Sequence, residues 1–311
     1  MAVRPDYQRV FAGGWRLRVL AGAWDGDLEN QVLELVRSRS WARHPQTIKA
    51  LLTVGGKERV LYLKIFHSAQ GLSAVKDLFR RSKAFRFWRQ GIALRESGFH
   101  VPVTIAVGEQ RRFRFVRRAF VLTEEIEGQA LPDFLARREA GCADSGDLTC
   151  KRHAIRVFGS LVRRFHQLGF VHGDMVPSNI LVAGSTRDGI KFYLMDNDRT
   201  RRFPLWSPQS LRRRNLVQLN RMPLPDISLQ DRMRFLHAYL DAGEFSTAER
   251  KLARWLELKT RQRRKDCDGV DPSVNFRRLM RWSPDLAGVP DVREARVGPF
   301  EVFGNGADAG K

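Results

Sequence analysis

Three polar side chains in the middle of the chain have the types and the spacing that phosphoryl transfer requires. Asp174 is followed five positions later by Asn179, and Asp196 closes an apolar stretch at residues 193–195. A carboxylate beside a substrate hydroxyl can accept its proton, while an amide and a second carboxylate can bind the magnesium ions that neutralise ATP phosphates. The sequence therefore predicts Asp174 as the catalytic residue and Asn179 and Asp196 as nucleotide and magnesium ligands.

Short apolar segments flank these residues and predict the strands that would hold them in place. Residues 170–171 come just before the loop of Asp174. Two further segments, residues 180–182 and 192–195, follow it. Apolar runs of this length, rich in Val, Ile, Phe and Tyr, are typical of buried strands. Such strands are needed because polar groups from two segments must converge on one metal–phosphate cluster.

A lysine near the end of another predicted strand could bind the nucleotide as well. Residues 47–54 and 59–66 are predicted as two strands of a hairpin, with the turn at residues 55–58. Lys64 lies on the second strand between apolar neighbours, where an ammonium group costs free energy unless an anion is close. The phosphates of ATP are such an anion. A lysine that points to solvent from an edge strand is the alternative.

The other elements are predicted from apolar residues at helical or strand spacing. Residues 1–45 give a mixed pattern. The helix that leads to the loop of Asp174 should be capped by Asp147 and run to Gly169, with Leu168 on its inward face. Further helices are predicted at residues 73–97, 209–222, 228–242 and 246–263, and a pair of strands at residues 113–116 and 119–123.

Composition limits the class of protein and of partner. The 311 residues allow two lobes with a sizeable core, and 55 Lys and Arg against 34 Asp and Glu give a net charge of +21. This excess favours an anionic partner, which could be nucleic acid, a phosphorylated substrate or an anionic membrane surface. No nucleic acid is expected, because zinc spacing, RNP aromatics and heptads are missing. Without a signal peptide or an apolar span of about 20 residues, the chain is expected in the cytoplasm.

Several segments match a known family in order along the chain. They are residues 61–64, 82–102, 122–128, 172–179, 196–199 and 215–240. The ending Asp196-Asn197-Asp198-Arg199 is the most specific of them. Together these segments resemble the bacterial lipopolysaccharide kinases, the heptose and Kdo kinases that act on the inner core of lipid A. The resemblance extends over residues 45–245.

The resemblance implies an α+β, protein-kinase-like fold with two lobes. Residues 1–126 would form a small, mostly antiparallel β lobe that carries the lysine for the nucleotide phosphates. Residues 127–285 would form a larger, mainly helical lobe with the catalytic and metal motifs. Residues 286–311 would be a flexible tail.

The resemblance also implies an activity. ATP with Mg²⁺ would phosphorylate a sugar hydroxyl, heptose or Kdo, of lipid A with attached core sugars. The protein would work at the cytoplasmic face of the inner membrane, bound peripherally to the anionic membrane surface. Lys64 would bind the nucleotide phosphates and Asp174 would deprotonate the acceptor hydroxyl. Asn179 and Asp196 would bind magnesium, and Asp198 would either add a metal contact or cap the next turn.

Two features depart from the family pattern. No glycine-rich loop precedes Lys64, and the nearest substitute is the turn at Gly55 and Gly56. Phe87 stands where a helical glutamate would pair with Lys64. Either another acid serves Lys64, or Lys64 works alone, or the enzyme is weak. The alternative functions are therefore a catalytically weak, membrane-associated regulator, or a soluble kinase of the aminoglycoside or choline type. Acceptor sites of the latter tend to be acid-lined, which suits this basic chain poorly.

Overall fold

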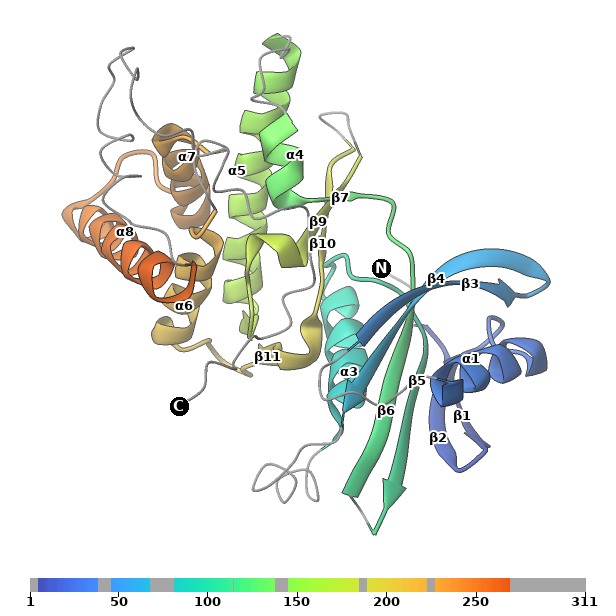
Figure 1. The fold of residues 1–311 in the computed structure, drawn as a ribbon. Coiled ribbons are helices and arrows are strands. Elements are labelled where there is room, and N and C mark those ends of the chain that lie inside the picture. Colours follow the sequence, from blue (N-terminus) through green and yellow to red (C-terminus); the bar gives the residue numbers. More distant parts are fainter. Residues whose placement is uncertain are drawn as a thin grey trace, which may run out of the picture. The chain divides into compact units, whose positions relative to one another are not determined.

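The computed structural model places most of the chain in one compact unit, Met1–Pro272. Its elements form a six-stranded antiparallel sheet followed by a mainly helical part, as Figure 1 shows. This confirms the α+β architecture with an antiparallel lobe and a helical lobe. The lobe boundary at residues 126 and 127 stays a prediction, and the predicted tail at residues 286–311 lies outside the described residues. Described are residues 5–38, 46–67, 81–113, 115–137, 145–184, 189–222 and 227–268.

The six-stranded sheet has the order β1-β2-β5-β6-β4-β3, and every neighbouring pair is antiparallel. Its first two strands come from residues 1–45, where the sequence pattern gave no clear prediction. The hairpin predicted around residues 55–58 is present as β3 and β4. The strands are β1 (Tyr7–Ala12), β2 (Trp15–Leu20), β3 (Gln46–Val54), β4 (Lys57–His67), β5 (Thr104–Arg112) and β6 (Phe115–Glu124).

Two helices cover opposite faces of this sheet. Leu61, Leu63 and Ile65 of β4 pack into one cluster with helix α1 (Gly26–Ser38), whereas Phe66 packs into another with helix α3 (Lys83–Glu96). Because successive residues of a strand point to opposite faces, Lys64 lies on the face of α3. Figure 1 shows α1 and α3 on the two sides of the sheet. Alternation along β4 therefore directs Lys64 away from the α1 cluster.

The pair Gly55 and Gly56 closes the β3–β4 hairpin. Both glycines have positive φ angles, +57° and +74°, which fit a tight turn. The ladder then runs from Val54 opposite Lys57 to Gln46 opposite Ile65. Lys64 is seven residues from the turn, about 23 Å along an extended strand. The glycine pair is therefore the turn of the predicted hairpin, and it lies well away from Lys64 along the strand.

The prediction of paired strands at residues 113–116 and 119–123 is also wrong. Residues 115–116 of the first segment and all of the second belong to the single strand β6, which pairs with β5 and β4. Phe113 adopts φ 49° and forms the turn between β5 and β6. The strand β6 lies between β5 and β4 in the sheet, and the apolar residues at the start of β5 had not been assigned in the sequence analysis. The β5–β6 hairpin was missed because its turn at Phe113 lacks the Asn-Gly or Asp-Gly pair that usually marks one.

The helical part packs around a core built on α5. Leu168 is 37% exposed and so does not face inward, and the helix begins at Ser145, two residues before the predicted cap at Asp147. Among the described helices, none is long and apolar enough to cross a bilayer. The elements are β7 (Gln129–Ala130), α4 (Leu131–Arg137), α5 (Ser145–Gln167), β8 (Phe170–Val171), η1 (Pro177–Asn179), β9 (Ile180–Ala183), β10 (Lys191–Leu194), η2 (Asn197–Arg199), β11 (Arg201–Arg202), α6 (Gln209–Leu219), α7 (Leu229–Leu240) and α8 (Thr247–Asp268).

Candidate active site

Lys64 of the sheet meets Asp196, which directly follows β10. The Lys64 Nζ lies 2.5 Å from Asp196 Oδ1, and both side chains are partly buried. Phe87 of α3, at the position where a glutamate was sought, is instead buried in an apolar cluster with Phe66. The structure thus supports the first alternative for Lys64, in which an acid other than a helical glutamate pairs with it. That acid is itself one of the predicted magnesium ligands.

Asp196 is held in an unusual backbone conformation. Its φ and ψ are 51° and 52°, in the left-handed region that Asp and Asn tolerate better than most residues. Hydrogen bonds fix the chain on both sides: Met195 N donates to Asn179 O at 2.9 Å, and Asn197 Nδ2 donates to Leu194 O at 2.8 Å. The bend that aims the Asp196 carboxylate at Lys64 is therefore built by its neighbours.

Asp196 and Asp198 form an electrostatically strained pair. Burial tends to raise the pKa of Asp196, but the Lys64 ammonium outweighs burial and leaves that pKa below its ordinary value. Burial and the neighbouring Asp196 carboxylate raise the pKa of Asp198. Two carboxyl groups this close repel each other when both are ionised, and a divalent cation between them would remove that repulsion.

Asn179 completes a donor set that suits magnesium. Its Nδ2 donates to Asp174 O at 2.9 Å, which leaves its Oδ1 for a cation. The described ranges contain no group of three or more His, Cys, Asp or Glu side chains that could hold a metal ion. Magnesium needs no such cluster, because it keeps water and substrate phosphates beside one or two carboxylates. Asn179, Asp196 and Asp198 thus fit Mg²⁺ held jointly with a nucleotide.

Asp174 is oriented by its own loop and by α6. Gln218 Nε2 donates to Asp174 Oδ1 at 3.3 Å, and the Asp174 N donates to His172 Nδ1 at 3.1 Å. The other ring nitrogen of His172, Nε2, lies 2.8 Å from Met195 O and so acts as the donor. Burial lowers the pKa of His172, which keeps the ring neutral in this tautomer. His172 therefore braces the loop and links it to the segment of Asp196.

Asn215 of α6 clamps the same loop and is fully buried. Its Oδ1 accepts from His172 N at 3.0 Å, and its Nδ2 donates to His172 O at 2.6 Å. Gln218 Oε1 accepts from Met175 N at 3.1 Å. The sequence analysis gave Asn215 and Gln218 no role. The sequence did contain a signal for them: two amide side chains lie three residues apart on a helix, among apolar residues. Amides in such a buried setting need fixed hydrogen-bond partners.

Gly173 is required because the loop touches η2 at this point. A Cβ atom at Gly173 would lie 2.2 Å from Arg199 Cβ and 2.7 Å from Arg199 O. We expect Gly173→Ala to lower the free energy of unfolding by about 1–3 kcal/mol through overpacking, and to lower activity with it. Urea denaturation of the purified variant measures the change. Gly26→Ala is the control, since nothing lies within 4 Å of that position and its stability should not fall.

His166 makes the fold sensitive to acid. Burial lowers its pKa to about 4, while Tyr239 and Asn215 hold its two nitrogens. Below the ordinary pKa of 6.5 the unfolded chain binds a proton that the folded chain does not. Stability should therefore fall as the pH drops from 6.5 towards 4, by about 3 kcal/mol from this residue. In His166→Gln, the free energy of unfolding measured against pH should no longer show this fall between pH 6.5 and 4. An unchanged pH dependence would contradict the low pKa of His166.

The structure thus brings the predicted residues together in two connected groups. Lys64, Asp196 and Asp198 form one, and Asp174 with Asn179 forms the other. Backbone bonds through Met195 join them. The chain can therefore present a cation, a fixed ammonium, and an oriented carboxylate to substrates in one region.

Comparisons with known proteins identify the family of the chain. Residues 37–239 match the family model described as lipopolysaccharide kinase (Kdo/WaaP) family. A 3-deoxy-D-manno-octulosonic acid kinase from Actinobacillus succinogenes is 28% identical over 134 residues, which cover 42% of this chain and 52% of that protein. The chain thus spans about half the length of this curated relative.

A solved structure shares the fold. It is described as WaaP in complex with acyl carrier protein and has a TM-score of 0.57 at 20% identity. The match covers 74% of this chain and 92% of that one. The family model extends over well more than half of the 311 residues, including every predicted site residue from Lys64 to Asp198. The chain belongs to the lipopolysaccharide kinase (Kdo/WaaP) family.

Proposed function

We propose that this protein is an ATP-dependent kinase that phosphorylates a sugar hydroxyl, heptose or Kdo, of the lipopolysaccharide inner core. The observation that carries the proposal is the ion pair of Lys64 with Asp196, connected through the loop backbone to an Asp174 carboxylate held by Gln218. A chain of this family with these groups in place has the parts for phosphoryl transfer.

Each residue has a role in this reaction. Lys64 binds the phosphates of ATP, and Asn179, Asp196 and Asp198 hold magnesium. When bound, magnesium neutralises the charge on the phosphates being transferred. Asp174 accepts a hydrogen bond from the acceptor hydroxyl and takes its proton as the phosphate is transferred. Gln218 fixes one carboxylate oxygen so that the other faces the hydroxyl.

A direct assay tests this function. The purified full chain is incubated with radiolabelled ATP, Mg²⁺ and lipid A that carries either Kdo alone or Kdo with heptose. Label on the glycolipid that is absent with Asp174→Asn supports the proposal, and the acceptor that is labelled identifies the sugar. Nucleotide binding without transfer would support the weak regulator instead. Transfer to an aminoglycoside or to choline would support the small-molecule kinase.

We further propose that the enzyme works on the anionic cytoplasmic face of the inner membrane. The proposed glycolipid acceptor and the net charge of +21 support this location. The segment that best suits contact with lipid follows β11. Leu205 is 87% and Trp206 66% exposed, beside the exposed Arg201 and Arg202. Apolar and Trp side chains favour the interfacial region of a bilayer, and each nearby Arg adds attraction to anionic lipid.

This segment, residues 205–206, is held out by anchors on either side. Phe203 N donates to Gly169 O at 2.9 Å, and the buried Ser207 Oγ donates to His166 O at 3.0 Å. The backbone is therefore fixed on both sides of the two exposed apolar side chains. β11 pairs with β8, which leads into the loop of Asp174, so lipid contact here would bring the acceptor near that loop.

We expect Leu205→Ser with Trp206→Ser to weaken binding to vesicles of phosphatidylglycerol and phosphatidylethanolamine. Loss of two partly inserted apolar side chains should cost roughly tenfold in affinity. Vesicle co-sedimentation measures the change. The matched control is Leu51→Ser with Leu258→Ser, two exposed leucines on other elements. If both double variants bind vesicles as tightly as the original chain, residues 205–206 do not contact lipid.

A further inference from the structure

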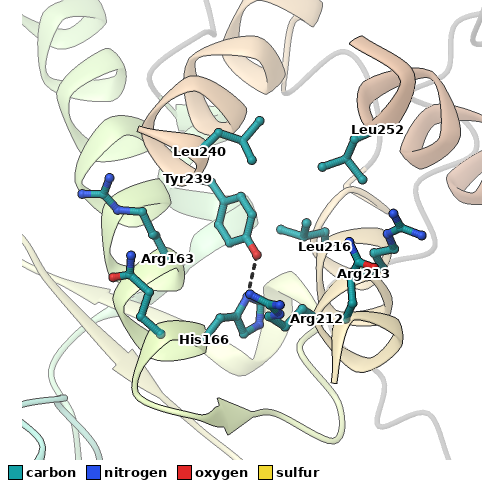
Figure 2. A pocket seen from close by; sticks show the side chains of 10 residues that line it. Arg163, His166, Arg212, Arg213, Leu216, Tyr239, Leu240 and Leu252 are labelled. Carbon is teal, nitrogen blue, oxygen red and sulfur yellow. Dashed lines mark hydrogen bonds between the residues drawn. The ribbon is translucent and has the colours of Figure 1, made fainter. Parts of the chain in front are cut away.

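A cavity lies among α5, α6, α7 and α8, and it is lined by residues of α6 other than Asn215 and Gln218. Its volume is about 250 Å³, slightly below the ~300–1,000 Å³ of pockets for drug-sized ligands. Figure 2 shows Tyr239 and His166 joined by a hydrogen bond, with Leu240 and Leu252 at one end and Arg212 near His166. The cavity therefore has a cationic part and an apolar part, and it suits a small ligand.

Two of its guanidinium groups have unused donors. The Nε atoms of Arg212 and Arg213 are buried without a hydrogen-bond partner. Over the described part of the chain, no ion pair joins either of them to a carboxylate, whereas Arg163 at the same cavity pairs with Asp241. The guanidinium carbon of Arg213 lies over the Trp255 ring, 5.3 Å from the ring centroid. Positioned guanidinium groups with unsatisfied donors favour a bound anion.

The surroundings leave that positive charge uncompensated. None of the ten residues that line the cavity is acidic. Burial is the main cause of the low pKa of His166, and the Arg212 charge lowers it further. Burial raises the pKa of Tyr239, and the Arg212 charge opposes that rise. Arg212 is thus close to both rings, and neither ring is charged at neutral pH.

We propose that this cavity, the Arg212–Arg213 pocket, binds a small phosphate monoester with a short apolar group. The two planar guanidinium groups would bind the phosphate oxygens, as such groups do in paired, directional hydrogen bonds. The apolar group would lie against Leu216, Leu240 and Leu252. This site is separate from the proposed kinase site and takes a different ligand.

Occupancy of the pocket acts on the catalytic loop through α6. The same helix carries Arg212 and Arg213 together with Asn215 and Gln218, which hold the backbone of His172 and the carboxylate of Asp174. His166 in the pocket wall also lies 3.3 Å from Asn215 Oδ1. A ligand that fixes α6 therefore favours the orientation of Asp174, a coupling carried by one helix and its hydrogen bonds.

The test uses n-butyl phosphate as the probe, with inorganic phosphate and 1-butanol as its two parts. Calorimetric titration of the full chain at constant ionic strength should show saturable binding of butyl phosphate that is tighter than that of either part. Arg212→Gln with Arg213→Gln should weaken it roughly tenfold or more. Arg214→Gln should leave it unchanged, because Arg214 is exposed on the same helix and does not line the pocket.

A second variant covers the case in which the double variant fails to fold. Arg212→Lys keeps the charge but loses the planar fork, so binding should still weaken. In the original chain, butyl phosphate should slow amide exchange over Gln209–Leu219, and this effect should be smaller in Arg212→Lys.

Four results would overturn the proposal. The first is no saturable binding, and the second is binding that is unchanged in Arg212→Gln with Arg213→Gln, which would indicate the nucleotide site. The third is equal weakening by Arg214→Gln, which would indicate general charge, and the fourth is equal binding of 1-butanol, which would indicate a purely apolar cavity. None of these readouts depends on phosphate transfer, so failure here is distinguishable from failure of the proposed kinase activity.

Discussion

Asp174→Asn is expected to lower kcat for phosphate transfer by about 10³-fold while ATP binding is retained. The amide cannot take the proton of the acceptor hydroxyl, and general-base catalysis of this kind contributes roughly 10²–10⁴-fold. The substitution is nearly isosteric. Gln218 Nε2 can still donate to the remaining oxygen, and the backbone bonds to His172 and Asn179 are unaffected. Steady-state kinetics with the labelled glycolipid acceptor and a separate ATP-binding titration give the two quantities.

The control for Asp174→Asn removes a carboxylate elsewhere. Asp133 on α4 is exposed, so Asp133→Asn makes the same chemical change away from the site. Its kcat should equal that of the original chain. If Asp174→Asn keeps most of its kcat while both variants are folded, Asp174 is not the base. A loss of ATP binding together with kcat would instead mean that the residue supports the nucleotide site.

Asp196→Asn should lower kcat/KM for ATP by on the order of 10³-fold. The change removes a proposed magnesium ligand and the anionic partner of Lys64 at once, and loss of one such electrostatic contact can cost about 10²–10³ in rate. Asparagine also tolerates the left-handed backbone of this position, so the fold should persist. Half-maximal activity should then need a higher Mg²⁺ concentration, which titration of Mg²⁺ at fixed ATP measures.

Asp241→Asn is a close control for this variant. Asp241, at the end of α7, also has a left-handed backbone, with φ 59°. It also forms an ion pair, with Arg163 of α5. It should change neither kcat nor the Mg²⁺ requirement. A second readout concerns Asp198, whose pKa is raised by burial and by the Asp196 charge. Carbon-13 NMR of the carboxyl groups should show the Asp198 pKa falling in Asp196→Asn; no change would show that the two groups do not interact.

Local pattern was enough to place the elements on which the site is built. The strands β8, β9 and β10 overlap the apolar segments at residues 170–171, 180–182 and 192–195. A short apolar run bounded by polar residues is typical of a buried strand. Ser228, the first residue of the helix predicted at residues 228–242, caps α7 through a capping box with Asp231. These signals depend on neighbours within a few residues.

Contacts across long sequence separations were not predictable in the same way. The strand β6 was divided into two predicted strands, whereas it pairs as one strand both with β5 and with β4, which lies far earlier in the chain. Leu168 was assigned to the core from helical spacing, yet it lies near the helix end, beyond the core contacts. The partner of Lys64 was sought on α3, whereas it lies 132 residues away at Asp196. Spacing along the chain does not encode which distant group arrives at a given face.

The sequence by itself determined the chemistry of this protein: the residue types at 64, 174, 179 and 196, and the short strands beside them, follow from local composition and period. Only the tertiary structure decided how those residues are supported. It placed Lys64 on the α3 face of the sheet, gave it Asp196 as its ion-pair partner, and set Asn215 and Gln218 behind the catalytic loop. The physical reason is that a buried charge or amide needs a partner, and that partner is chosen by packing in space rather than by position in the chain.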